Sequence, residues 1–116
     1  MSDQIADAIG AVADHIEENG WWRGGLFGPN GAVCIMGGVI RALHLNNTQT
    51  QTLGCHPLGP GVVNRIVTTI QARGYGGTIP EWNDDTKFGA KDEQDVLDLI
   101  RRAEKIERNE GVDPDE

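Results

Sequence analysis

Apolar side chains recur at helical spacing in four stretches of the chain. The first, from Asp3 to Asn19, forms one apolar stripe, and Gly20 follows where a helix can end in a left-handed residue. The second, from Cys34 to His44, is apolar around most of its circumference, which predicts a buried central helix. The third begins at about Gly61 and ends at Arg73, and the last runs from the capping residue Asp92 to Arg108. Four helices are therefore expected.

Between the first two helices the periodicity changes. The run from Trp22 to Phe27 is separated from Ala32 and Val33 by Gly28-Pro29-Asn30-Gly31, a sequence typical of a tight reversal. We expect a short β-hairpin here, and residues 75–80 can add one short strand. The predicted fold class is α+β, mainly α, with four helices and a short β-hairpin or small sheet.

Two further features bear on packing and boundaries. Gly37 and Gly38 weaken the second helix, so we expect another element, such as the indole of Trp82, to approach it closely there. The polar segment from Asn46 to Gly61 is long for a loop and is a candidate binding segment. Residues 1–109 are expected to form a single globular domain and residues 110–116 a flexible acidic tail.

The chain of 116 residues has a formal charge of −8, and its distribution is uneven. The charge is −5 over residues 1–18, +4 over residues 19–80 and −7 over residues 81–116. A negative field repels phosphate, which disfavours direct nucleic-acid binding. No apolar stretch reaches the roughly 18 residues that span a bilayer, and no leader sequence is visible, so a cytoplasmic protein with no membrane contact is expected.

Catalytic residues are hard to assemble from this sequence. Cys34 begins a helix, where the helix dipole lowers a thiol pKa. A cysteine hydrolase could use His44, or else His56 or His15, as base and Asn83 to orient it. The alternative is that Cys34 is a buried thiol that packs as a small hydrophobe. No zinc-ligand spacing and no phosphate-binding glycine motif is present, so we expect neither a metal nor a cofactor.

A binding patch is the other candidate site. Its members are aromatic, charged or amide side chains from the glycine-rich middle of the chain and from the segment before the last helix. They are Trp22, Arg23, Arg41, Trp82, Asn83 and Asp84. The aromatic members could instead belong to the core, and partial exposure of a tryptophan would mark a binding surface.

Three motifs carry a resemblance: Gly20-Trp21, Cys34-x-x-Gly37 and Trp82-Asn83-Asp84. With the order of the predicted helices, they make residues 5–106 similar to a family of small proteins of unknown function from actinobacteria and their phages, such as mycobacteriophages. At Trp22 the chain departs from the family, in which many members carry Cys. The resemblance implies a phage or actinobacterial accessory protein and no particular mechanism.

These observations favour a small acidic accessory protein that acts as a non-enzymatic protein-binding module. If it is a viral protein, its partner is a host protein in the host cytoplasm. Two alternatives stay open: a cysteine hydrolase using Cys34, and an acidic decoy that imitates DNA with the carboxylates of the two terminal helices. A homodimer is open as well.

Overall fold

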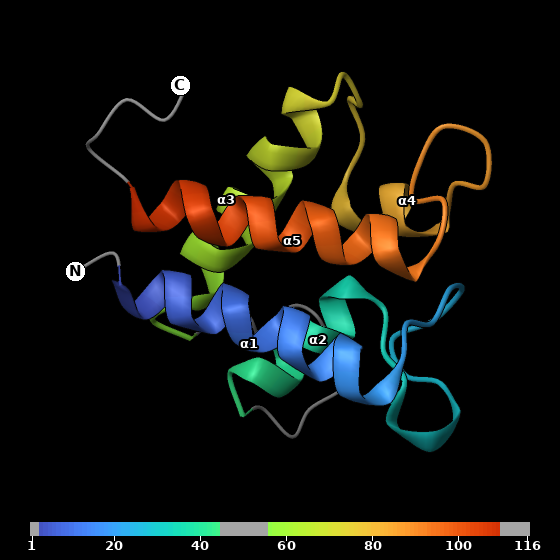
Figure 1. Ribbon diagram of the computed structural model, residues 1–116, viewed down its shortest axis with the longest axis horizontal. Helices are drawn as coiled ribbons and strands as arrows, with labels where there is room; N and C mark the ends of the chain where they lie inside the picture. The colour runs from blue at the N-terminus through green and yellow to red at the C-terminus, as the bar shows by residue number, and fades with distance from the viewer. Residues whose placement is uncertain (1–2, 45–55, 110–116) are drawn as a thin grey trace.

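A computed structural model describes residues 3–44 and 56–109 of the chain. Within these residues it contains five α-helices and one 3₁₀ turn (Figure 1): α1 (Asp3–Asn19), η1 (Pro29–Gly31), α2 (Ile35–Ala42), α3 (Gly59–Ala72), α4 (Ile79–Asp84) and α5 (Glu93–Arg108). The tail from residue 110, and residues 46–55 of the predicted long loop, lie outside the described residues. No described helix is long and apolar enough to cross a membrane.

The terminal helices α1 and α5 lie side by side and form much of the core (Figure 1). On α1, Ile9, Val12 and Ile16 are fully buried, at the helical spacing that predicted this element. On α5, Leu99 and Ile100 are equally buried. The helices predicted near α1, α2, α3 and α5 are therefore confirmed.

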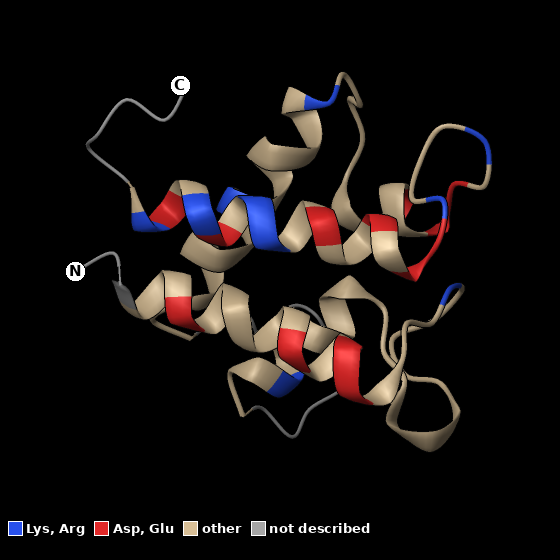
Figure 2. Cartoon of the chain, in the orientation of Figure 1, with Lys and Arg blue, Asp and Glu red and all other residues tan. Residues whose placement is uncertain are grey.

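Figure 2 shows acidic positions along both α1 and α5 and basic positions along α5. Two arginines of α5 pair with acidic residues of α1 across the seam between these helices. Arg101 contacts Asp14 of α1 at 2.7 Å and Glu104 of its own helix at 3.3 Å. Arg108 contacts Asp7 at 3.0 Å and also reaches Glu104. Acidic side chains of both terminal helices are thus paired with arginine along this seam.

The predicted α+β fold class is wrong, because within the described residues there are helices, turns and loops but no strand or sheet. The reversal expected after Phe27 does occur, as the 3₁₀ turn at Pro29–Gly31. It is flanked only by single bridges, from Val33 to Trp21 and from Val33 to Phe27. This part of the chain contains no hairpin, and the class is all-α.

Two features keep residues 21–33 from forming a β ladder. Gly20 and Gly24 have φ values of 102° and 98°, and this left-handed conformation turns the chain away from an extended path. The N–H of Gly24 donates instead to a side chain, the Asp84 carboxylate, over 2.9 Å. Continuous pairing of neighbouring segments is interrupted at these points.

Helix α4 begins inside the segment where a short strand was predicted. Thr78 accepts a hydrogen bond from the Glu81 N–H, and the Glu81 carboxylate accepts one from the Thr78 N–H, which is a capping box. Pro80 in the first turn is compatible with helix initiation because its missing N–H is not needed there. These local preferences start a helix where a strand was expected.

The paired glycines of α2 do allow a close approach, but an indole does not make it. A side chain at Gly37 would collide with the backbone carbonyl of Leu26, and one at Gly38 would meet Val12 at 2.9 Å. The predicted contact with Trp82 is not among the nearest neighbours of either glycine. The glycines instead let α2 pack directly against α1 and against the loop that precedes α2.

Candidate functional site

Asn83 lies at the junction between α4 and the loop that follows α1, and it is 1% exposed. Its Oδ1 accepts hydrogen bonds from Trp21 Nε1 at 2.7 Å and from the backbone N–H of Ile35 at 3.1 Å. Its Nδ2 donates to the Trp22 carbonyl at 3.2 Å and to Asp84 Oδ1 at 2.9 Å. The amide's full hydrogen-bonding capacity is therefore used inside the fold. We call this arrangement the Asn83 junction.

Arg23 extends the same junction to the loop that follows α4. Its guanidinium lies 4.8 Å from the centroid of the Trp21 ring, within the range of a cation–π contact. Its Nε donates to the Asn83 carbonyl at 3.3 Å, and its Nη2 donates to the carbonyl of Ala90. One side chain thus joins the loop after α1 to α4 and to the loop that follows α4, 60 to 67 residues later in the sequence.

Cys34 is 6% exposed and caps the start of α2. Its Sγ accepts the N–H of Gly37 at 3.3 Å. Burial raises the pKa of the Cys34 thiol, and this outweighs the opposing effect of the nearby backbone N–H groups. The thiol is therefore protonated near neutral pH, which is the opposite of the shift that a nucleophile needs.

The three residues of the hydrolase alternative are only partly brought together. Cys34 and Asn83 line one small hollow of about 160 Å³, whose walls include no histidine. His44 lies beyond the far end of α2 from Cys34, and the 8 helical residues between them rise by about 12 Å. Asn83 has no hydrogen bond left for orienting a histidine. The arrangement does not assemble a nucleophile with its base.

The residues predicted as a binding patch differ in burial. Trp82 and Asn83 are buried, and Trp82 lies beneath the Arg73 guanidinium, 5.5 Å from the ring centroid. Arg41 is exposed and stacks on Phe27 at 4.4 Å. Of these three predicted positions, only Arg41 is accessible at the surface.

The other predicted patch members are closer together. Trp22 is 37% exposed, and its ring covers Gly28. Arg23 is half-buried in the Asn83 junction, and Asp84 is exposed beside it. Trp22 is therefore a partly exposed tryptophan, the feature that we took as the mark of a binding surface, although its ring also packs on the turn.

A more exposed aromatic was missed. Phe88 is 75% exposed, on the loop between α4 and α5. Asp85 Oδ1 accepts the N–H groups of Lys87 at 2.8 Å and of Phe88 at 3.0 Å, and Gly89 N–H donates to the Asp85 carbonyl at 3.1 Å. The N–H of Ala90 donates to the Trp82 carbonyl. The loop is therefore held in one conformation while its aromatic ring points into solvent.

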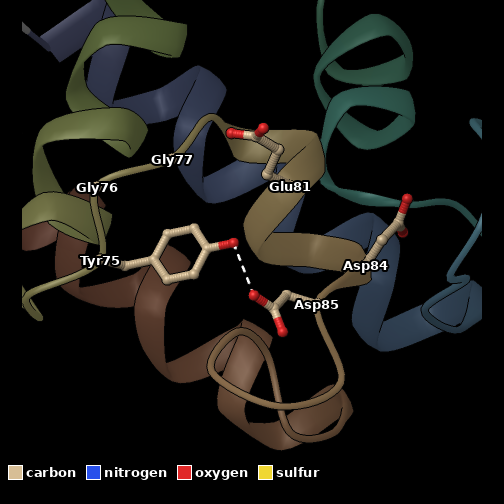
Figure 3. A pocket seen from close by; sticks show the side chains of 6 residues that line it. All are labelled: Tyr75, Gly76, Gly77, Glu81, Asp84 and Asp85. Carbon is tan, nitrogen blue, oxygen red and sulfur yellow. Dashed lines mark hydrogen bonds between the residues drawn. The ribbon is translucent and has the colours of Figure 1, made fainter.

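Tyr75 fixes this loop from the other side. Its hydroxyl donates to Asp85 Oδ2 at 3.0 Å, and Figure 3 shows the ring directed at that carboxylate. The N–H groups of Phe88 and Lys87 lower the pKa of Asp85, so the loop's acceptor stays ionised in mildly acidic solution. The spacing Asp85-x-Lys87-Phe88 is typical of an Asx-type turn and could have indicated this loop from sequence.

A hollow of about 470 Å³ opens beside the Tyr75–Asp85 pair (Figure 3). Besides Tyr75 and two glycines, its walls are the carboxylates of Glu81, Asp84 and Asp85. We call it the acidic hollow. Among the described residues, no group of three or more His, Cys, Asp or Glu side chains has the geometry to hold a metal ion.

Together, the described residues form a set of packed helices in which a glycine-rich loop is fixed to a short capped helix by one buried asparagine. A family model described as a family of unknown function, DUF6197, matches residues 1–106, and the chain belongs to this family. No curated protein and no solved structure matches the chain. The expected resemblance to a small family of unknown function is confirmed.

Proposed function

We propose that this chain is a non-enzymatic protein-binding module whose contact surface is centred on Phe88. The observation that carries the proposal is the 75% exposure of this ring on a loop whose backbone is fixed by hydrogen bonds. Single exposed apolar side chains are common on proteins and do not by themselves indicate a binding site, so the proposal depends on the ordered loop that carries this ring. Here Asp85, Tyr75 and Arg23 all serve to order the loop that displays the ring.

Preorganisation supports a binding role energetically. Burying a phenyl side chain contributes about 1.5 to 3 kcal/mol. A loop that is already fixed does not lose further conformational freedom when it binds, so more of that energy appears as affinity. Aromatic anchors of this kind are frequent among the residues that dominate binding energy at protein interfaces.

The two alternatives have less support. A hydrolase needs an ionisable thiol beside a base, whereas Cys34 has a raised pKa and its hollow includes no histidine. A DNA mimic needs unpaired carboxylates in a row, whereas Arg101 and Arg108 pair with the acidic side chains between α1 and α5. We also propose, from the resemblance to phage proteins, that the partner is a host protein met in the host cytoplasm.

Quantitative affinity capture tests this function. Three immobilised proteins are each incubated with lysate of the cells in which the gene is expressed. They are the parent chain, its Phe88→Ser variant and a matched Lys105→Ser variant at an exposed position on α5. The expected result is a partner retained by the parent chain and by Lys105→Ser, and depleted at least tenfold on Phe88→Ser. Equal capture by all three proteins, with circular dichroism showing intact folds, contradicts the proposal.

A further inference from the structure

Helix α4 is bordered by a second hollow that is mainly apolar. It has a volume of about 380 Å³, and we call it the α4 groove. Its apolar walls come from α2, α3 and the start of α4, and they are Met36, Val63, Val67, Ile79 and Pro80. Val63 and Val67 of α3 are only partly buried, so the groove is an apolar surface that α3 and α4 leave uncovered. One or two apolar side chains of a partner would fit a volume of this size.

The α4 groove and the acidic hollow meet along one short segment. Gly76, Gly77 and Glu81 line both of them. The groove extends from these residues toward α3, and the acidic hollow extends toward Asp84 and Asp85. A ligand that follows Gly76 and Gly77 would therefore contact an apolar wall and a carboxylate-lined wall together.

The charge of this surface has one sign. The described residues that line the two hollows include three carboxylates and no lysine or arginine. Glu81 uses one oxygen in its capping box, and Asp84 uses one to accept from Gly24 and Asn83. The second oxygen of each carboxylate has no hydrogen-bond partner within the described part of the chain.

The backbone between Tyr75 and Gly77 is also unpaired. None of its N–H or C=O groups bonds to another described residue. Neither glycine carries a side chain; a Cβ at Gly76 would meet open space, whereas one at Gly77 would meet the Glu81 carboxylate and the Tyr75 ring. An exposed, unpaired backbone beside side-chain pockets is the arrangement that binds an extended peptide, since main-chain hydrogen bonds supply affinity and the pockets supply specificity.

We propose that the α4 groove and the acidic hollow together bind an extended segment of a partner protein, in which a lysine or arginine alternates with a large apolar residue. In an extended segment, neighbouring side chains point to opposite sides. One side would place the cation near Glu81 and Asp84, and the other would fill the α4 groove. This inference rests on the proposed function and names the chemistry of the partner.

Charge argues against the other occupants. A second copy of this chain carries a net charge of −8 and would bring acid against acid. A phosphate-bearing surface, whether nucleic acid or lipid headgroup, would be repelled by the three carboxylates.

The test is a selection of random 12-residue peptides displayed on the immobilised, full-length chain. The expected product is a family of peptides with Lys or Arg at an odd spacing from Leu, Ile, Met or Phe. Binding of the enriched peptide is then measured by fluorescence polarisation. The double variant Glu81→Gln/Asp84→Asn removes two charges but keeps the acceptor oxygens, because a glutamine also completes a capping box.

We expect this variant to weaken peptide binding about tenfold, the combined effect of two exposed ion pairs. The matched variant Glu18→Gln/Asp98→Asn removes the same charges from exposed positions on α1 and α5 and should change the affinity less than twofold. In heteronuclear NMR spectra, the amides of Gly76 and Gly77 should shift on peptide addition.

Any of three results would overturn the inference. They are that no peptide is enriched, that the enriched peptides lack a basic residue, or that the peptide binds both double variants with equal affinity. If that happens while capture through Phe88 succeeds, the proposed function stands and only this partner chemistry is wrong. If capture fails as well, both are wrong.

Discussion

The Asn83 junction makes a direct prediction about stability. Replacing Asn83 by Ala removes a side chain that accepts two hydrogen bonds and donates two others. The backbone N–H of Ile35 would then be left in a fully buried position without a partner. The indole N–H of Trp21 would also lose its acceptor, although that side chain is only partly buried and could regain water.

The magnitude follows from these four bonds. A buried donor without an acceptor costs about 1 to 3 kcal/mol, and a partly exposed one costs less. Losing the bonds to Trp22 and Asp84 adds up to about 1 kcal/mol each, while the better helix propensity of alanine returns about 0.5 kcal/mol. We expect the free energy of unfolding to fall by about 3 kcal/mol.

Urea denaturation followed by tryptophan fluorescence measures this change, since Trp21 and Trp22 report on the junction itself. Asn64→Ala, an exposed asparagine on α3, is the matched control and should change stability by less than about 0.5 kcal/mol. A loss below about 1 kcal/mol for Asn83→Ala would mean that the junction is not a structural centre of the fold.

Three further outcomes are expected. Mass spectrometry should show that iodoacetamide does not label Cys34 in the folded protein at pH 6 or pH 8 but labels it readily in urea. Fast labelling of the folded chain at pH 6 would restore the hydrolase alternative. Gly37→Ala should lower the free energy of unfolding by about 2 kcal/mol because the new Cβ meets a backbone carbonyl. The control Gly76→Ala, whose Cβ meets open space, should change it little. Equal melting temperatures for the two variants would contradict this. The pKa of the Asp85 carboxylate lies below its ordinary 3.8 in the folded protein, so the ionised carboxylate stabilises the loop at higher pH and this effect is lost as the pH falls through the folded pKa. The NMR shift of the Phe88 amide should therefore titrate with a midpoint below 3.8. A midpoint above 3.8 would show that the hydrogen bonds from the N–H groups to Asp85 are not formed.

The helices were predictable where one apolar stripe runs the length of an element. α1 and α5 each bury one face against the other, so their periodicity alone defines them. The glycine-rich loop was not predictable in the same way. Its backbone is paired with side chains from α4 and α5, such as Asp84 and Glu93, which lie some 60 to 72 residues away in sequence. Turn signals indicate a reversal but do not reveal such partners.

The candidate site was predictable in part. Asn83 was a candidate site residue from sequence, but sequence does not show that both ends of its amide are used inside the fold. Trp82 was a candidate both for the binding patch and for the core, and it lies in the core. Phe88 was overlooked because a lone phenylalanine among polar residues carries no periodic signal, and its exposure depends on hydrogen bonds to Asp85 that only the folded loop provides.

Photo-crosslinking tests the central claim, that a partner protein binds at the surface around Phe88. A benzophenone amino acid is placed at Phe88 in one variant and at Lys105 in the other, and each is irradiated in the cells where the gene is expressed. The account predicts one dominant crosslinked protein from position 88 and none from position 105. Crosslinking that is equal at both positions, or absent at position 88 while the chain is folded and abundant, would contradict it.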